Sequence, residues 1–236
     1  MQKERFTRSD FDCCRHMPDP FHPAAFVLAG GKSSRMGQDK ALLAFSGRPL
    51  VAHALSILVE AGLSARIAGA DPEARTSLSA YASVIDDAQP GLGPLAGICA
   101  AFASTGARHA VFLPVDLPLL PASLISYLLR SARLTGRSVT VASINGFPQT
   151  FPAVLDRALL SFLQNELHAG RLGCFAAFQA GAASLDQRVH VARVELLVQS
   201  GQIEHPHGLP PARWFLNVNT PDELERARKQ IPCSIA

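Results

Sequence analysis

Short apolar runs alternate with longer stretches of helical periodicity across residues 24–145. The apolar runs predict strands at 24–29, 65–70, 83–86, 109–115 and 138–144. The intervening stretches predict helices at 49–62, 72–82, 94–105 and 121–134. Strands joined by helices of this length favour right-handed crossovers and a parallel sheet covered on both faces. The pattern therefore predicts an α/β fold, a three-layer α/β/α sandwich with a mostly parallel sheet.

The pattern is less regular in the last third of the chain. Residues 156–170 predict a helix, and residues 172–181 favour a second one. The stretch 181–213 gives weak signals, and we interpret it as an insertion or a substrate-binding loop. Thr220, followed by Pro221, has the features of an N-cap, so a final helix is expected there.

Composition excludes several classes of protein. The 236 residues are 48% hydrophobic and 17% charged, which suits one large or two small domains, and no apolar run approaches the ~20 residues that cross a bilayer. The net charge of +3 is spread along the chain, so a nucleic-acid partner is not expected. Five cysteines without a C-x-x-C pair favour reduced thiols and a cytoplasmic location. Residues 1–22 lack periodicity and are expected to form a flexible N-terminal extension, with 23–236 as a single domain.

Three polar clusters follow predicted strands. They are "GGKSSRMGQDK" at 30–40, "DDAQPGLGPLAG" at 86–97 and "PVDLPLLP" at 114–121. Ligands of open α/β sheets bind at the carboxyl ends of the strands, so we expect all three clusters on one rim.

The first cluster has the character of a phosphate-binding loop. Gly30 and Gly31 allow backbone N–H groups to approach an anion, and Lys32, Arg35 and Lys40 add positive charge. The spacing is neither the dinucleotide fingerprint nor a P-loop. The alternative is a solvated basic turn.

Asp116 closes an apolar strand and is followed by stiffening prolines, which suits a carboxylate that holds Mg²⁺; the alternative is that it caps the next helix. Asp86 and Asp87 could belong to the site or form a solvated pair. Asn217 and Asn219 lie on one face of an extended segment and could contact a polar substrate, or Asn219 could only assist the helix start.

His205 and His207 have the spacing of metal ligands but no obvious third ligand, so a metal site there is disfavoured.

The stretch "LAGGKSSRMGQDKALL" closely resembles the signature of the molybdenum cofactor guanylyltransferases, the MobA family of nucleotidyltransferases. The likeness continues, in the family's order, through "GPLAGI", "LPVDLPLLP" and "FLNVNTPDEL". Together these motifs cover residues 24 to about 160 and 213–230.

The resemblance implies a Rossmann-like nucleotidyltransferase fold that transfers GMP from GTP to the terminal phosphate of molybdopterin, with Mg²⁺, and releases pyrophosphate. It implies a nucleotide-binding part at 23–145 and an acceptor-binding part at 146–236. The nucleotide contacts that it implies are Leu28, Ala29, Gly30, Gly31, Lys40, Gly69, Asp87 and Asp116. It makes Arg35, Lys40 and Asp116 catalytic, Asp116 the metal ligand, and Asn217 and Asn219 the acceptor contacts. Gly69 is a departure, because the family often has Asn at the end of the second strand.

Three alternatives remain open. A cytidylyltransferase acting on the same acceptor usually has L-A-A-G where this chain has "LAGG", so Gly30 favours guanine. A nucleotidyltransferase for a sugar phosphate or another small metabolite is the second, and a non-catalytic nucleotide-binding protein is the third. Other proteins of cofactor biosynthesis are expected as partners, because molybdopterin is unstable in solution.

Overall fold

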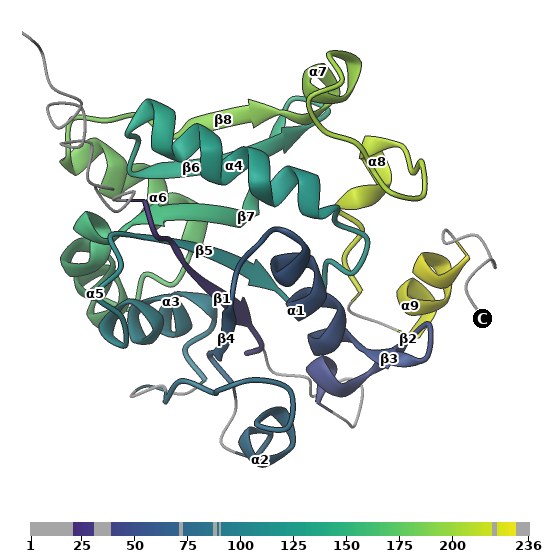
Figure 1. The fold of residues 1–236 in the computed structure, drawn as a ribbon. Coiled ribbons are helices and arrows are strands. Elements are labelled where there is room, and N and C mark those ends of the chain that lie inside the picture. The colour runs from purple at the N-terminus through teal and green to yellow at the C-terminus, as the bar shows by residue number, and fades with distance from the viewer. Residues whose placement is uncertain are drawn as a thin grey trace, which may run out of the picture.

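The computed structural model describes residues 21–30, 39–70, 73–86, 89, 91–218 and 221–229, and its centre is one six-stranded sheet (Figure 1). The strands lie in the order β4-β1-β5-β7-β6-β8. In chain order their bounds are β1 Ala24–Leu28, β4 Ala65–Ala68, β5 His109–Pro114, β6 Val139–Ile144, β7 Phe147–Asp156 and β8 His190–Arg193. A separate two-stranded ribbon pairs β2 (Ala44–Phe45) with β3 (Arg48–Pro49).

Five strands of the sheet run in one direction, and β7 alone is reversed. β1 is parallel to β4 and β5, and β6 is parallel to β8, whereas β7 is antiparallel to both β5 and β6. The predicted mostly parallel sheet is therefore confirmed. Its parallel strands share one C-terminal rim, as the crossover pattern requires.

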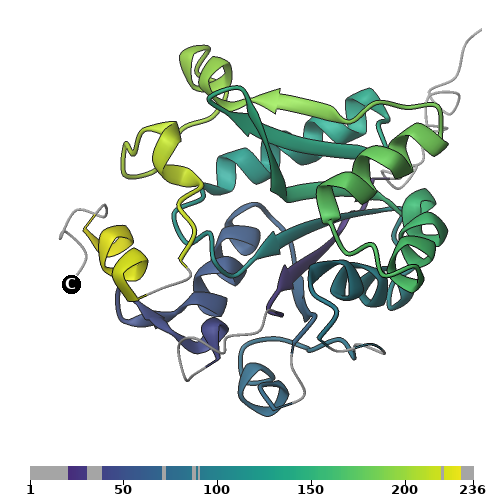
Figure 2. The same ribbon diagram turned by 180° about the vertical axis from the view of Figure 1, so that it is seen from behind.

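Helices cover both faces, as Figure 1 and the reverse view in Figure 2 show. The helices and helical turns are η2 Lys40–Leu42, α1 Leu50–Glu60, α2 Arg75–Leu78, α3 Pro94–Ala103, α4 Ala122–Thr135, η3 Arg157–Leu159, α5 Leu160–His168, α6 Cys174–Ser184, α7 Val194–Gln199, α8 Pro211–Trp214 and α9 Pro221–Arg228. Ala25 and Val27 of β1 face the α1/α4 core, while Phe26 and Leu28 face the α3/α5/α6 core. The strand alternation thus divides the interior into two apolar layers.

Two predictions about elements are wrong. The stretch 83–86 is not a strand, because only Val84 forms an isolated bridge, to Ile67. The stretch 181–213 is not a loop, since it contains the end of α6, all of β8 and α7, and the start of α8. β8 has four residues and α7 has six, too few to show a clear period.

The ten-residue strand β7 was not predicted. It contains Pro148 and Pro152, and proline in a sequence argues against an interior strand because it lacks an N–H donor. The β6–β7 register shifts between Val141 and Ser143, so the pairing is irregular next to Pro148.

The proposed N-terminal extension and Thr220 fall outside the described residues, apart from positions 21 and 22. Within the described chain, no helix has both the length and the apolar character needed to cross a membrane.

Candidate active site

The ends of three neighbouring strands build the rim where the polar clusters meet. Past the end of β1, the Ala29 N–H donates to the Ala68 carbonyl of β4 at 3.0 Å. Past the end of β5, the Val115 N–H donates to the Leu28 carbonyl at 3.1 Å. These bonds place the residues that follow each strand side by side. Leu28 and Ala29 are buried, so only their backbone or a small part of their side chains is open to a ligand.

Three glycines from three elements pack against one another at this rim. A Cβ atom on Gly30 would lie 2.0 Å from the Gly69 carbonyl oxygen, and one on Gly97 would lie 3.0 Å from the Gly69 Cα. Any side chain at Gly30 would therefore clash with backbone. The contact brings the end of β1, the end of β4 and the first turn of α3 together. The sequence motifs contain Gly30 and Gly97, and Gly69 ends the second predicted strand, but these patterns did not predict that the three glycines touch.

Gly69 has a φ of +70°, in the left-handed region that glycine adopts freely and asparagine adopts more readily than most residues. The replacement of the family's frequent Asn by Gly69 therefore keeps this backbone shape. It removes an amide side chain, so any base or ribose contact from this position is limited to the backbone.

Lys40 and Asp116 form an ion pair across the rim. The Lys40 Nζ donates to the Asp116 Oδ2 at 2.8 Å, and the two side chains are 18% and 22% exposed. Lys40 opens the helical turn η2, which is held by the Asp39 carboxylate accepting from the Ala41 N–H at 2.9 Å. The sequence placed Lys40 and Asp116 in one site from motifs 76 residues apart, and the geometry brings them into direct contact.

Asp116 does not cap the following helix. The N-cap of α4 is Pro121, and no side chain makes a capping hydrogen bond there. The alternative role for Asp116 is therefore excluded. Its carboxylate lies half-buried after β5, with Lys40 as the cation beside it.

The residues at Asp116 fit a hydrated Mg²⁺ better than a closed protein cage. Mg²⁺ prefers oxygen ligands and commonly uses one or two carboxylates together with substrate phosphates and water. No group of three or more His, Cys, Asp or Glu side chains suited to holding a metal is found in the described part of the chain. A metal here would thus depend on Asp116 and on oxygens supplied by a bound nucleotide.

The C-terminal segment joins the same rim. The Val218 N–H donates to the Asp116 carbonyl oxygen at 3.0 Å, and the Val218 side chain is fully buried. Asn217, which is exposed, directly precedes Val218, so this backbone bond holds Asn217 close to the segment at Asp116. Sequence patterns alone could not reveal this contact, because it is a backbone bond between segments about 100 residues apart in the chain.

Gly31, Arg35, Asp87 and Asn219, four residues predicted for the site, lie outside the described residues.

Two neighbouring candidates have other partners. Asp86 forms an ion pair with Arg75 of α2, and both side chains are well exposed, as expected of a solvated pair. His205 donates from Nε2 to the Leu119 carbonyl at 3.1 Å and accepts at Nδ1 from the His207 N–H at 3.1 Å. Both ring nitrogens of His205 are therefore engaged within the protein.

Comparison with known proteins adds to this geometry. The family model described as "MobA-like NTP transferase domain" matches residues 25–189. The chain is 35% identical over 218 residues to a molybdenum cofactor guanylyltransferase from Rhizobium meliloti (strain 1021), covering 89% of this chain and 92% of that protein.

Two solved structures share the fold. A molybdopterin-guanine dinucleotide biosynthesis protein A from Archaeoglobus fulgidus superimposes with a TM-score of 0.70 at 22% identity, covering 87% of this chain and 97% of the other. A 2-C-methyl-D-erythritol 4-phosphate cytidylyltransferase from Thermus thermophilus gives a TM-score of 0.63 at 14% identity, with 88% and 98% covered. The same scaffold is thus similar to proteins named for different nucleotides.

Proposed function

Because the chain belongs to the MobA-like NTP transferase family, we propose that it transfers GMP from GTP to the terminal phosphate of molybdopterin and releases pyrophosphate. The observation that carries the proposal is the Lys40–Asp116 pair at 2.8 Å beside the packed glycines. It puts a cation suited to phosphate and a carboxylate suited to Mg²⁺ on one rim, in a chain that is 35% identical to a protein named for this activity.

The chemistry is an in-line displacement at the α-phosphorus of GTP. The acceptor phosphate is anionic at neutral pH, so it attacks without a general base, and the P–O bond to the pyrophosphate breaks as the new P–O bond forms. Catalysis then consists of alignment and charge neutralisation. Lys40 and Arg35 neutralise phosphate oxygens, and the bound Mg²⁺ would supply the remaining positive charge at Asp116.

We assign the nucleotide to the β4–β1–β5 part of the rim. The backbones of Gly30, Gly69 and Gly97 pack together there, and Gly30 and Gly69 are partly exposed, so a base or ribose can approach these two without meeting a side chain. Leu28, Ala29, Gly31 and Asp87 belong to this nucleotide subsite in the proposal. The division into a nucleotide-binding part at 23–145 and an acceptor-binding part at 146–236 follows the same order, with Asn217 and Asn219 on the acceptor side.

Cytidylyl transfer is the second candidate, because a cytidylyltransferase shares the fold. Gly30 alone cannot decide between the bases, since its contact with Gly69 gives it a packing reason to be glycine. Transfer in the cytoplasm, with molybdopterin handed over by other proteins of the same biosynthesis, is part of the proposal.

The test is incubation of the protein with Mg²⁺ and each α-³²P-labelled nucleoside triphosphate, with and without molybdopterin. We expect label to pass to molybdopterin from GTP and pyrophosphate to appear only when the acceptor is present. Transfer from CTP in preference to GTP would contradict the guanylyl assignment. Nucleotide binding without transfer to any acceptor would favour a non-catalytic protein.

A further inference from the structure

The aromatic side chain of Phe147 is 72% exposed, although phenylalanine is usually buried. It is the first residue of β7, directly after the turn that joins β6 to β7. Its position can be related to the candidate active site through the strand order and the pairing register.

The hairpin that carries Phe147 has a defined shape. Ile144 pairs with Phe147, so the loop has two residues, Asn145 and Gly146, with φ angles of 52° and 79°. Two successive positive φ angles with an Asn-Gly pair are typical of a tight type I′ turn. The Asn145 N–H also donates to the Glu195 carboxylate of α7. Phe147 is therefore held on a fixed support.

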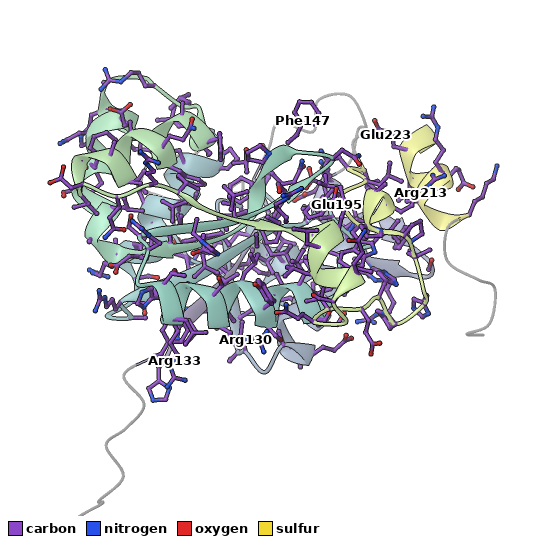
Figure 3. All side chains as sticks on the ribbon, turned by 90° about the horizontal axis from the view of Figure 1, so that it is seen from above. Arg130, Arg133, Phe147, Glu195, Arg213 and Glu223 are labelled. Atoms are coloured by element: carbon purple, nitrogen blue, oxygen red, sulfur yellow. The ribbon has the colours of Figure 1, made fainter. Side chains whose placement is uncertain are left out.

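The side chain of Phe147 lies on the same face of the sheet as α3. Phe151 of β7 packs against Phe178 of α6, with ring centroids 6.1 Å apart. That face is covered by α3, α5 and α6. Figure 3 shows Phe147 projecting on the side of the sheet opposite Arg130 and Arg133 of α4. The glycine contact at the first turn of α3 belongs to this same face.

The hairpin also extends beyond the ends of the nucleotide-binding strands. Phe112 of β5 and Val141 of β6 both pair with Ala153 of β7, so the end of β5 at Pro114 is level with Ser143 of β6. Ile144 and its partner Phe147 come one residue later, roughly 3 Å further at the rise of a strand. The hairpin thus ends just beyond the rim that carries Asp116.

The strand order arranges these features in a line. The glycine contact lies at β4 and β1, Asp116 follows the adjacent β5, and Phe147 belongs to β7, the next strand along, each about 4.8 Å from its neighbour. A nucleotide bound at the glycines with its phosphates at Asp116 would have its acceptor on the β7 side. The inference rests on the proposed function, in which the acceptor is molybdopterin. Its pterin is a fused ring system that carries the phosphate on a short arm.

We propose that the exposed ring of Phe147 is the platform on which the pterin of the acceptor stacks, so that Phe147 is a specificity-determining residue of the acceptor subsite. Stacking suits this role, because it holds a flat heterocycle while leaving its phosphate free to reach the α-phosphorus.

The test compares Phe147→Ala with Phe147→Tyr and with the matched control Leu134→Ala. Leu134 is also a strongly exposed apolar side chain, with 77% exposure. It lies near the C-terminus of α4, away from the C-terminal rim of the sheet. Molybdopterin binding without nucleotide and the KM values for molybdopterin and GTP are measured for each protein. Phe147→Ala is expected to raise the molybdopterin Kd and KM about tenfold, within the range for base–aromatic stacking.

Phe147→Tyr and Leu134→Ala are expected to resemble the wild type, and the KM for GTP is expected to stay the same throughout. An unchanged molybdopterin Kd in Phe147→Ala would overturn the platform, as would an equal weakening of GTP. A wild type that fails to transfer GMP contradicts the proposed function itself. A wild type that transfers GMP beside an unimpaired Phe147→Ala contradicts the platform alone.

Discussion

At the scale of single residues, the proposed active site depends on the Lys40–Asp116 ion pair and on the backbone contact between Gly30 and Gly69. Lys40 and Asp116 are 2.8 Å apart with both side chains partly exposed, so a nucleotide phosphate or a metal can compete for either partner. The sequence predicted both residues for the site because each belongs to a polar cluster that follows a predicted strand. It could not predict their contact, which depends on the turn η2 and on the path of the chain after β5.

Lys40→Met is expected to lower kcat/KM for GTP about 10- to 100-fold, the loss typical of a hydrogen bond to a charged group. The reason is that the ammonium would neutralise phosphate charge. Steady-state pyrophosphate release measures the effect. Lys229→Met is the matched control, because Lys229 is an exposed lysine at the end of α9. Equal kinetics for the two variants would remove Lys40 from the nucleotide subsite.

Gly30→Ala is expected to lower the free energy of unfolding by about 1 to 3 kcal/mol, as overpacking does. The new Cβ would lie 2.0 Å from the Gly69 carbonyl oxygen, which is backbone and cannot move aside cheaply. Urea unfolding measures the loss, with Gly106→Ala as control because a Cβ at Gly106 would meet nothing within 4 Å. If both variants were equally stable, the close packing at Gly30 would be wrong.

At the scale of elements, helix α3 runs from the glycine contact, at the C-terminal ends of the strands, to the other end of the sheet. Gly97 in its first turn packs on Gly69, and at its other end the Arg157 guanidinium donates to the Phe102 and Thr105 carbonyls. The Phe102 carbonyl also accepts from the Thr105 N–H at 3.4 Å, so Arg157 adds a charged donor to the end of the helix. Arg157 therefore fixes the helix whose first turn belongs to the proposed nucleotide subsite.

Removal of this clamp by Arg157→Met is expected to cost about 1 to 3 kcal/mol of stability, because two helix-terminal acceptors lose a charged donor. Chemical denaturation of the variant gives the value. Arg171→Met is the comparison, since Arg171 forms only an exposed pair with Glu166 and should change stability little. A loss at Arg157 no greater than at Arg171 would contradict the clamp.

The sequence predicted most elements near the nucleotide rim and fewer beyond it. β1, β5, α1 and α4 have strong periodic patterns, and their observed bounds lie within two residues of the prediction. In β7 the prolines concealed a strand, although Asn145-Gly146 is a hairpin signal. Elements as short as β8 and α7 gain their order from packing on β6, and such long-range stabilisation leaves no local pattern.

At the scale of the whole molecule, four partly or fully buried histidines in different parts of the fold link folding to pH. Burial lowers the pKa of His53, His109, His190 and His205 below the ordinary value of 6.5. The nearby His207 lowers the pKa of His205 further. Below about pH 6.5 the unfolded chain therefore binds more protons than the folded one.

The free energy of unfolding is consequently expected to fall as the pH is lowered from 7 to 5. Urea titrations at intervals of half a pH unit measure it. In His205→Gln the fall should be smaller, because one group that resists protonation in the folded state is gone. A stability that is flat or that rises on acidification would contradict the buried, neutral histidines.

The two thiols of the α3/α5/α6 core, Cys99 and Cys174, provide a second check on the structure. Burial, with a contribution from nearby Cys99, raises the pKa of Cys174 to about 12. Since the thiolate is the reactive form, we expect Cys174 to resist alkylation at pH 8 until the protein unfolds. Peptide mapping by mass spectrometry after iodoacetamide treatment, with and without urea, measures this; rapid labelling of native Cys174 would show that the α6 region is more open.

A single-turnover assay decides whether the rim at Asp116 carries out guanylyl transfer. Wild type and Asp116→Asn are mixed with α-³²P-labelled GTP, Mg²⁺ and molybdopterin, and circular dichroism confirms that both are folded. The account predicts that label passes to molybdopterin in the wild type and that transfer by Asp116→Asn is at least about 100-fold slower, since charge stabilisation is lost. Transfer by Asp116→Asn at the wild-type rate, or none from GTP by the wild type, would contradict it.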